Sequence, residues 1–429
     1  MKVVEYTAPD FEEFLQSLDR RAVASEGVRE TVAGIIAEVR SRGDTALVEL
    51  TQKFDGADLS AGLLVSEEEW MAAEAVVTDS TREAVAATLR NINFFAQKSL
   101  RQDWSALNEQ GAEVGERFVP FERVGCYVPG GKAPLVSTAL MTAGFAQAAG
   151  VPEIVAATPC GADGAVNPEL LYALKAAGVS EVIKVGGAQG VAALALGTES
   201  IAPVQKIVGP GNDFVVEAKR QLIGAISIDL LPGPSEIMVL ADESANPAFV
   251  AADLLGQAEH GPDSIVGLVT TSRELLDGVL REVEGQAETL SRGDYLRKVL
   301  ADQAFAVVVE DLAAGVAVVN AFAPEHLSLV VKEEAQCLPQ ILTASAIYVG
   351  SFSPVAVGDF LAGPSHTLPT GGSGKSFSGL RADQFQRRVS VVRLDQEAVG
   401  KSVAAVEEFS RIEGLDAHGR SARIRVSLD

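Results

Sequence analysis

The stretch Arg123-Val-Gly-Cys-Tyr-Val-Pro-Gly-Gly131 decides the fold class, because strand-like residues run directly into a proline-glycine turn. A helix-like segment follows from Ser137 to Ala149. The same order of strand, glycine turn and helix recurs at Gly186-Gly-Ala-Gln189 and at Gly209-Pro-Gly-Asn212. This repetition is typical of a parallel sheet whose strands are joined by crossover helices.

A second alternating set of strands and helices begins near Ile237 and ends with a strand-like run at 346–349. The residues from about 10 to 108 carry apolar side chains at helical spacing, with a break near Gly43. We therefore predict an α/β fold with two Rossmann-like parallel-sheet lobes, a helical N-terminal region and a small C-terminal tail domain.

These patterns suggest four units with distinct boundaries. We expect an N-terminal helical extension at 1–25, a larger α/β lobe made of 26–126 and 236–380, a second α/β lobe at 127–235, and a tail at 381–429. The tail has a short β-like run at 388–393 and a helix at 397–410, which is too little chain for a core of its own. It must therefore pack against another surface.

The composition narrows the possible partners. The formal net charge of −23 repels nucleic-acid phosphates and anionic membrane surfaces, so we expect small-molecule ligands or further copies of the chain. The three cysteines are widely spaced, which favours a reducing compartment over a disulfide framework. Neither a signal peptide nor an uncharged apolar run of about 20 residues is visible. The expected location is the cytoplasm.

Only four histidines occur among the 429 residues, and each lies beside carboxylates, amides or glycine turns. Histidine is the side chain best suited to carry a proton near pH 7, and it is the commonest metal ligand. The settings are Gln257-Ala-Glu-His260, Pro324-Glu-His326, a Gly/Pro-rich loop that holds Asp359 and His366, and Glu413-Gly-Leu-Asp-Ala-His418. A shared site would explain this distribution.

Each setting also has a plain structural explanation. Gln257 and His260 share one face of a helix end and could bind a metal, but solvation of the helix end explains the pair equally well. Glu325 and His326 suit acid/base chemistry, yet two exposed polar residues at a turn would look the same. Asp359 could be a solvated acidic cap.

The glycine turns indicate ligand binding without naming the ligand. Backbone N–H groups and helix N-termini at the carboxyl ends of parallel strands can hold phosphates. No turn matches the G-x-G-x-x-G dinucleotide fingerprint. The run Gly371-Gly-Ser-Gly-Lys-Ser376 fails the P-loop spacing because the first glycine of that motif would fall on Pro369, so we reject P-loop ATP binding.

Taken together, nine ordered segments resemble the histidinol dehydrogenase family over essentially the whole chain. They are Val124-Gly-Cys-Tyr-Val-Pro-Gly-Gly, Gly186-Gly-Ala-Gln, Val208-Gly-Pro-Gly-Asn, Gly233-Pro-Ser-Glu, Gln257-Ala-Glu-His-Gly-Pro-Asp-Ser, Ala323-Pro-Glu-His-Leu, Gly358-Asp-Phe, His366-x-Leu-Pro-Thr-Gly-Gly and Glu413-Gly-Leu-x-Ala-His. The resemblance implies oxidation of L-histidinol to L-histidine in two NAD-dependent steps through an enzyme-held aldehyde. It also implies one zinc ion per active site and an intertwined homodimer.

The resemblance assigns roles residue by residue. The expected zinc ligands, which also contact the substrate, are Gln257, His260, Asp359 and His418. The expected acid/base pair is Glu325 and His326, and His326 also touches the substrate. The further expected substrate contacts are Ser235, His366 and Glu413, and the expected NAD contacts are Tyr127, Gln189 and Asn212. In the family the tail that carries the last histidine is supplied by the partner subunit.

Two other functions remain open at this point. One is a related zinc- and NAD-dependent dehydrogenase that oxidises another amino- or hydroxy-substituted alcohol; the presence of His366 and Glu413 argues against it. The other is a non-catalytic zinc- or nucleotide-binding regulatory protein, which would be expected to lack Glu325 or His326. The chain also departs from the family pattern at Leu196, Asp213 and 373–376, beside the NAD side or in a loop.

Overall fold

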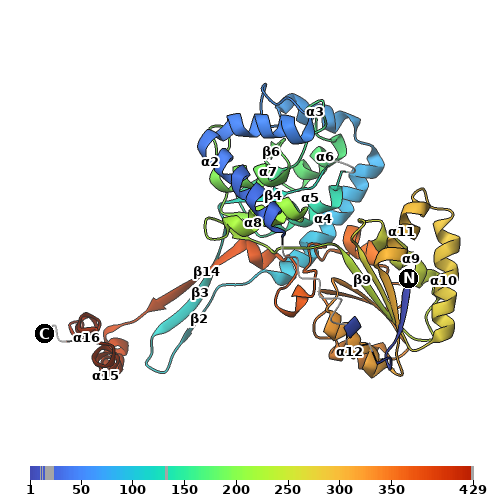
Figure 1. The fold of residues 1–429 in the computed structure, drawn as a ribbon. Helices are drawn as coiled ribbons and strands as arrows, with labels where there is room; N and C mark the ends of the chain where they lie inside the picture. The colour runs from blue at the N-terminus through green and yellow to red at the C-terminus, as the bar shows by residue number, and fades with distance from the viewer. Residues whose placement is uncertain (10, 12, 15–23, 131–133, 427–429) are drawn as a thin grey trace.

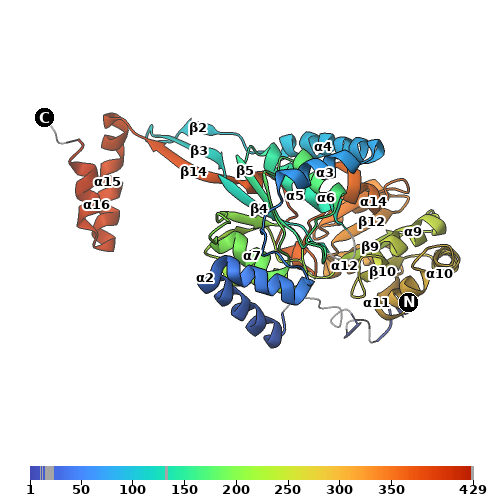
Figure 2. The ribbon, with the colours of Figure 1, turned by 90° about the horizontal axis from the view of Figure 1, so that it is seen from above.

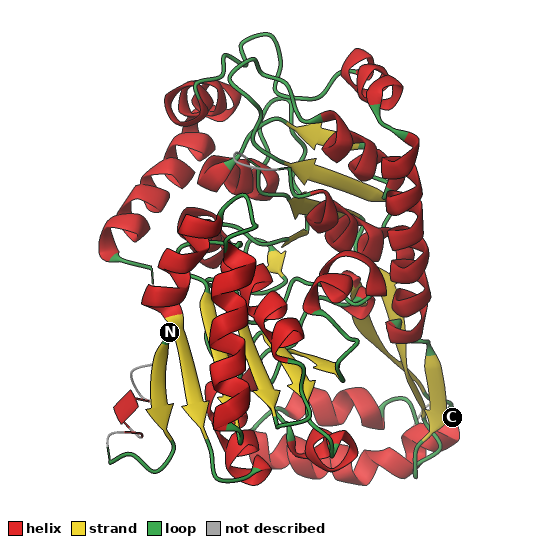
Figure 3. Ribbon diagram, turned by 90° about the vertical axis from the view of Figure 1, so that its right-hand side faces the viewer, coloured by secondary structure: helices red, strands yellow, loops and turns green. Residues whose placement is uncertain are grey.

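The computed structural model describes residues 1–9, 11, 13–14, 24–130 and 134–426. These residues form two parallel-sheet lobes and an arm that carries the last helices away from both lobes (Figures 1 and 2). Helices surround the sheets of both lobes (Figure 3), which confirms the expected α/β class. In the described part of the chain, no helix has the length and apolar character needed to cross a membrane.

One lobe contains a six-stranded sheet in which all neighbouring strands are parallel. In spatial order its strands are β1 (Lys2–Glu5), β11 (Ala304–Val308), β10 (Ile265–Thr270), β9 (Glu236–Ala241), β12 (His326–Val330) and β13 (Ala346–Val349). The helices that connect them are α9 (Pro247–Ala258), α10 (Arg273–Ala287), α11 (Gly293–Gln303) and α12 (Leu312–Phe322). The central strands are buried and almost wholly apolar, as expected for a sheet covered on both faces.

The other lobe contains a five-stranded sheet, also parallel throughout. In spatial order its strands are β6 (Glu181–Ile183), β5 (Glu153–Ala157), β4 (Arg123–Tyr127), β7 (Lys206–Val208) and β8 (Ser227–Ile228). Its crossover helices are α5 (Val136–Ala148), α6 (Pro168–Ala176), α7 (Gly187–Leu196) and α8 (Asp213–Leu222). Without β1, the five remaining strands of the six-stranded sheet and the five strands of the other sheet have the same spatial order, 3-2-1-4-5, when each set is numbered along the chain. The two lobes therefore have the same topology.

The N-terminal part of the chain differs from the expectation in two ways. Residues 2–5 form an edge strand beside β11, because the consecutive β-branched residues Val3 and Val4 favour extended backbone, whereas we expected a helical extension over 1–25. Residues 15–23 of that extension lie outside the described residues. The second difference concerns the helices that follow.

Three long helices belong to the five-stranded lobe: α2 (Glu26–Asp55), α3 (Glu67–Val76) and α4 (Asp79–Ser99). Their apolar stripes are buried in the same clusters as α5, α6 and α7. The expected grouping of 26–126 with 236–380 is therefore wrong, since a helix stripe identifies a packing face but not the sheet that covers it. Gly43, at φ 51°, kinks α2 where the break was predicted.

The arm begins as an antiparallel three-stranded sheet of β2 (Trp104–Leu107), β3 (Glu113–Pro120) and β14 (Gln386–Arg393). It ends in two helices that pack against each other, α15 (Gln396–Glu413) and α16 (Asp416–Arg423), far from both lobes in Figures 1 and 2. The helical spacing expected to continue to about residue 108 ends at Ser99, because Trp104–Leu107 pair with β3 instead.

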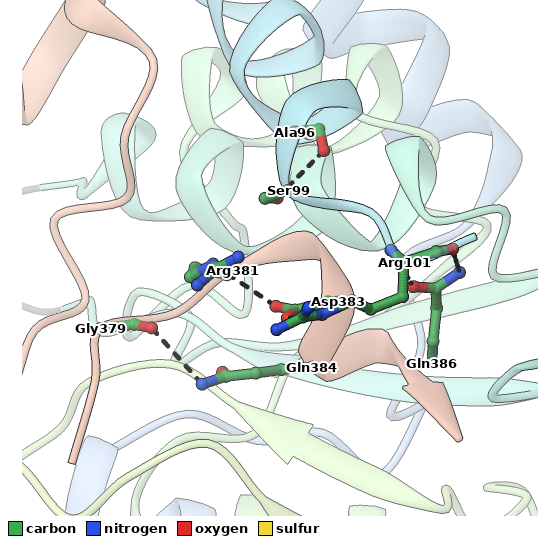
Figure 4. A network of polar contacts seen from close by, with 8 residues as sticks. All are labelled: Ala96, Ser99, Arg101, Gly379, Arg381, Asp383, Gln384 and Gln386. Carbon is green, nitrogen blue, oxygen red and sulfur yellow. Dashed lines mark hydrogen bonds and ion pairs between the residues drawn. The ribbon is translucent and has the colours of Figure 1, made fainter. Parts of the chain in front are cut away.

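The base of the arm is held to the body by polar contacts (Figure 4). The Arg101 N–H donates to Gln386 Oε1 at 3.1 Å, and the Arg101 guanidinium lies 3.4 Å from Asp383 Oδ2. Asp383 also pairs with Arg381 at 3.5 Å. These contacts fasten the start of β14 to the end of α4, so the arm leaves the body in a defined direction.

The remaining short helices connect the larger elements around the site. They are α13 (Glu334–Cys337), η1 (Leu338–Gln340), α14 (Val355–Val357), η2 (Gly358–Ala362), η3 (Ser373–Lys375) and η4 (Ala382–Phe385).

Candidate active site

The candidate site lies at the amino end of the six-stranded sheet. Glu325 immediately precedes β12, His326 is its first residue, and Ser235 immediately precedes the neighbouring strand β9. Since α9 runs back from the carboxyl end of β9, its last turn, which carries Gln257, and the following His260 reach the same edge. Ligand sites in open α/β sheets usually occupy the opposite, carboxyl edge, so this placement was not foreseen.

A strained backbone residue leads into the expected acid/base pair. Ala323 ends α12 with φ 54°, and it is the one non-glycine residue with positive φ in the described part of the chain. It is fully buried and precedes Pro324, so the chain turns sharply from the helix into β12. A left-handed alanine costs free energy that the surrounding structure must supply, and such strain is commonly found at functional sites.

The backbone of Glu236 binds both members of the pair through its two polar groups. Its N–H donates to Glu325 Oε2 at 2.8 Å, and its carbonyl oxygen lies 2.9 Å from His326 Nδ1. A carbonyl can only accept, so Nδ1 carries the hydrogen and Nε2 is the atom free to take a proton. Glu325 Oε2 lies 3.5 Å from Nδ1 on the same side of the ring.

Burial and the charges of neighbouring groups shift the pKa values of both Glu325 and His326. Burial raises the pKa of Glu325 to about 8, although the neighbouring His326 charge opposes the change. Burial lowers the pKa of His326, but the charges of Glu325 and Asp359 outweigh it and raise that pKa to about 9. The two groups therefore titrate as a coupled pair that holds protons near neutral pH.

Asp359 brings a third segment to the pair from the helical turn η2. Its Oδ1 lies 3.3 Å from His326 Nε2, and both atoms are buried without a hydrogen bond of ordinary geometry to any described residue. The Asp359 charge also reaches His260, whose pKa is lowered by burial and partly restored by that carboxylate. Gln257 is buried beside them, and its Nε2 has no hydrogen-bond partner among the described residues.

This arrangement fits a metal ion only in part within one chain. Among the described residues, no group of three or more His, Cys, Asp and Glu side chains has the geometry to hold a metal. Of the four expected ligands, Gln257 is not a His, Cys, Asp or Glu residue, and His418 lies on α16 of the arm. His260 and Asp359 remain, together with the unpartnered amide of Gln257.

His366 connects the site to the other lobe. Its Nδ1 lies 2.9 Å from the Asp359 carbonyl oxygen, and its Nε2 lies 3.2 Å from Thr138 Oγ1 on α5. Burial lowers the pKa of His366, and the Asp359 charge opposes that change. The carbonyl oxygen can only accept, so Nδ1 carries a hydrogen, and in a neutral ring Nε2 would accept from the threonine hydroxyl.

Sequence reasoning missed Glu236 and Thr138. Glu236 stood inside the quoted Gly233-Pro-Ser-Glu segment, but its contribution is made mainly by its backbone, which no residue pattern reveals. Its side chain accepts from the Gly371 N–H at 2.9 Å and so secures the glycine-rich loop. Thr138 lies in an apolar helix of the other lobe and carries no sequence signal.

Two expected site residues lie away from this cluster in the same chain. Glu413 is the last residue of α15 and His418 is on α16, and both are exposed on the arm. Figure 1 shows these helices apart from both lobes. Within one chain, the structure therefore gathers Ser235, Gln257, His260, Glu325, His326, Asp359 and His366, and not the two residues of the tail.

The expected NAD contacts lie at the carboxyl edge of the five-stranded sheet. Tyr127 ends β4, and its hydroxyl accepts from the Gly187 N–H at 2.9 Å. Gln189 is buried in the first turn of α7, and Asn212 caps α8 by accepting from Phe214 N and Val215 N, each at 3.2 Å. Gly131, the end of the first glycine turn, lies outside the described residues.

The edge between β4 and β7 is where the strand order of this sheet reverses, the usual ligand position in such folds. Burial raises the pKa of Tyr127 to about 12, so its hydroxyl stays protonated. Asp55, at the end of α2, is close enough for its charge to contribute to that shift. Its buried Oδ2 has no hydrogen-bond partner in the described part of the chain, a feature that no sequence motif indicated.

Comparisons with known proteins agree with the fold. The family model for histidinol dehydrogenase matches residues 18–426. The histidinol dehydrogenase of Syntrophotalea carbinolica is 42% identical over 428 residues, with 99% of each chain covered. That of Geobacillus kaustophilus is 43% identical over 409 residues, covering 95% of this chain and 96% of its own.

A solved structure shares the whole architecture. The crystal structure of histidinol dehydrogenase from Elizabethkingia anophelis superposes with a TM-score of 0.94 at 34% identity, covering 99% of this chain and 98% of its own. Full-length similarity at this level settles the family. The chain belongs to the histidinol dehydrogenase family.

Proposed function

We propose that this enzyme, an oxidoreductase of histidine biosynthesis, converts L-histidinol to L-histidine in two NAD-dependent oxidations with one zinc ion per active site. The observation that carries the proposal is the buried Glu325–His326 pair, oriented by the backbone N–H and C=O groups of Glu236 and facing Asp359. Two bases of different chemistry in one enclosed site suit two successive oxidations of one carbon.

His326 is the base for the first oxidation. Its Nδ1 hydrogen points to the Glu236 carbonyl oxygen, so Nε2 accepts the proton of the substrate hydroxyl as the carbon gives up hydride. When bound, NAD supplies the hydride acceptor and zinc supplies a template that orients the substrate. The ring cannot rotate without breaking the Nδ1 contact, and this keeps Nε2 aimed at the reacting group.

Glu325 is the base for the second oxidation. Its carboxylate removes a proton from the water that attacks the aldehyde carbon, after which a second hydride can leave. Its raised pKa makes it a stronger base than an ordinary glutamate at the pH where it is ionised. Keeping the aldehyde in the same closed site prevents its loss to solvent.

Gln257, His260 and Asp359 would hold the zinc ion, with His418 as the fourth ligand. Support comes from Asp359 Oδ1, a buried oxygen that has no hydrogen-bond partner among the described residues. Imidazole nitrogen and carboxylate oxygen are ordinary zinc ligands, although a glutamine ligand is uncommon. Ser235, His366 and Glu413 would contact histidinol.

His418 and Glu413 would enter the site of a second copy of the chain. The arm is fastened to the body at its base and ends in two helices with no partner beyond each other in the described residues. Those helices expose large apolar side chains, including Phe409 at 64% and Ile412 at 62%. Such faces mark contact surfaces, so an intertwined homodimer would cover them.

Tyr127, Gln189 and Asn212 would bind NAD at the reversal point of the five-stranded sheet. Asn212 at the N-terminus of α8 places backbone N–H groups where a pyrophosphate could bind. The second candidate function, a zinc- and NAD-dependent dehydrogenase for another alcohol, has no observation in its favour beyond the same fold.

A substrate panel tests the proposal. NADH formation is measured with histidinol, histidinal and other amino- or hydroxy-substituted alcohols at equal concentration. We expect turnover with histidinol and histidinal and at least about a hundred-fold lower kcat/KM with alcohols that lack the imidazole, since the site's polar groups would then lack partners. No turnover with histidinol would refute the proposal.

A further inference from the structure

A fully buried ion pair lies beneath the five-stranded sheet. Neither of its residues is among the expected catalytic, metal-binding, substrate-binding or NAD-binding residues. Lys219 on α8 contacts Asp229, which follows β8, and both side chains have 0% exposure. Burying two charges is costly, and an apolar pair of similar volume is often equally stable or more stable. The contacts that the pair makes indicate a role other than stabilising the fold.

The pair holds a single residue of a glycine turn from both sides. The Gly209 N–H donates to Asp229 Oδ2 at 2.7 Å, and Lys219 Nζ donates to the Gly209 carbonyl oxygen at 2.9 Å. Both polar groups of Gly209 are thereby bound to the ion pair. Charge-assisted hydrogen bonds of this kind are about twice as strong as neutral ones.

Gly209 is also pressed against the neighbouring strand. Its φ of +116° is rare for residues with side chains, and a Cβ atom would lie 2.1 Å from the Tyr127 carbonyl oxygen. Three residues further on, Asn212 caps α8, the helix that carries Lys219. One clamp thus sets the separation between the end of β4 and the start of α8.

We propose that Lys219 and Asp229 are positioning residues that hold the Gly209–Asn212 turn in the shape that binds the dinucleotide. The inference rests on the proposed function, in which Tyr127 and Asn212 contact NAD. Neither charge reaches the turn's outer face, since both side chains are buried beneath it. Lys219 and Asp229 would therefore act through the shape of the turn. Removing them should weaken the binding of NAD rather than that of histidinol.

The test removes both charges while keeping the volume, in the double variant Lys219→Met/Asp229→Leu of the full-length enzyme. We expect the KM and the calorimetric Kd for NAD to rise between about ten-fold and a hundred-fold, as for other small misplacements of a binding group. The KM for histidinol at saturating NAD should stay within about two-fold, because the six-stranded lobe is untouched.

Lys206→Met is the matched control. Lys206 is another buried lysine of this sheet, and its Nζ donates to the Ile228 carbonyl oxygen at 2.7 Å and not to Gly209. We expect it to leave the NAD constants unchanged, even if the melting temperature falls. The milder Asp229→Asn keeps an acceptor for the Gly209 N–H, so its effect on NAD should be smaller than that of the double variant.

The outcomes separate this inference from the proposed function. A folded double variant with wild-type affinity for NAD, or with equal losses for NAD and histidinol, overturns the clamp alone. An NAD defect in Lys206→Met as large as in the double variant also overturns it, because general destabilisation would then explain both. A wild-type enzyme that neither binds nor reduces NAD overturns the proposed function and the clamp together.

Discussion

His326 Nε2 lies 3.3 Å from Asp359 Oδ1, which joins the first residue of β12 to the helical turn after α14. The contact brings the expected proton-accepting atom next to an expected metal ligand. It also places both at the amino edge of the six-stranded sheet, facing the other lobe through His366 and Thr138. The predictions below follow from this arrangement.

Replacing Glu325 with glutamine should impair the second oxidation more than the first. The amide cannot take a proton from water, and loss of a general base costs about a hundred- to ten-thousand-fold in rate. We expect oxidation of supplied histidinal to fall by that factor, while the first NADH equivalent from histidinol still forms in a single turnover. Normal oxidation of histidinal by Glu325→Gln would show this role to be wrong; Glu310→Gln, an exposed change, is the control.

Replacing His418 with asparagine should lower the zinc content. One of four ligands would be lost, although His418 is exposed and remote from the other three within its own chain. We expect elemental analysis after dialysis to show zinc well below one ion per chain, with activity reduced in parallel. Unchanged stoichiometry would contradict the assignment. Arg420→Gln on the same helix, also exposed, should behave like the wild type.

Mixing two inactive variants should restore activity if the tail serves a second copy. Hybrids of His418→Asn and Glu325→Gln chains would have one site with both changes and one site with neither. After denaturation and refolding of an equal mixture, about a quarter of wild-type activity is expected, since half of the dimers are hybrids and each has one intact site. If the tail folded back onto its own chain, every site would carry one change and the mixture would stay inactive.

The rate should rise with pH. Burial raises the pKa of Glu325 to about 8, and the charges of Glu325 and Asp359 outweigh burial to raise that of His326 to about 9. Both groups act as bases only after losing their protons, so kcat/KM for histidinol should increase through this range. A cation held by Asp359 would weaken the effect of that carboxylate on the pKa of His326. The apparent pKa values in the pH–rate profile of the zinc-loaded enzyme should therefore lie at or below about 8 and 9. A profile that falls between pH 7 and 9 would contradict the assignment.

The same shift has a consequence for stability. Glu325 has a folded-state pKa above the ordinary value of 4.5, so the folded protein binds more protons than the unfolded chain between pH 4.5 and about 8. Its contribution to the free energy of unfolding is therefore present at low pH and is lost as the pH rises through that interval. Glu325→Gln should melt at a temperature that depends less on pH in this range.

The α/β class and the glycine turns could be predicted because strand, turn and helix periods are local. The strand β12 was missed: the run from His326 to Val330 is short and follows a proline, and only pairing with β9 and β13 makes it a strand. The grouping of α2 with the five-stranded sheet depends on contacts far apart in sequence, and an apolar stripe does not specify its partner.

Motifs predicted which side chains belong to the candidate site. They could not predict the backbone contacts that orient those side chains. The sequence showed Glu325 and His326 side by side, but not that the backbone N–H and C=O of Glu236 orient them. It placed His418 among the ligands, while the structure shows that residue on an arm directed away from the site of its own chain. Geometry of that kind arises from tertiary packing, which no local pattern encodes.

The most direct test of the account is the activity of the enzyme with histidinol and NAD before and after removal of its metal. Dialysis against a chelator should abolish NADH formation, because Gln257, His260 and Asp359 would then have no ion with which to orient the substrate. Zinc added back in equimolar amount should restore it, with one ion bound per active site. Full activity in the chelated protein, with no metal detected by elemental analysis, would contradict the central claim.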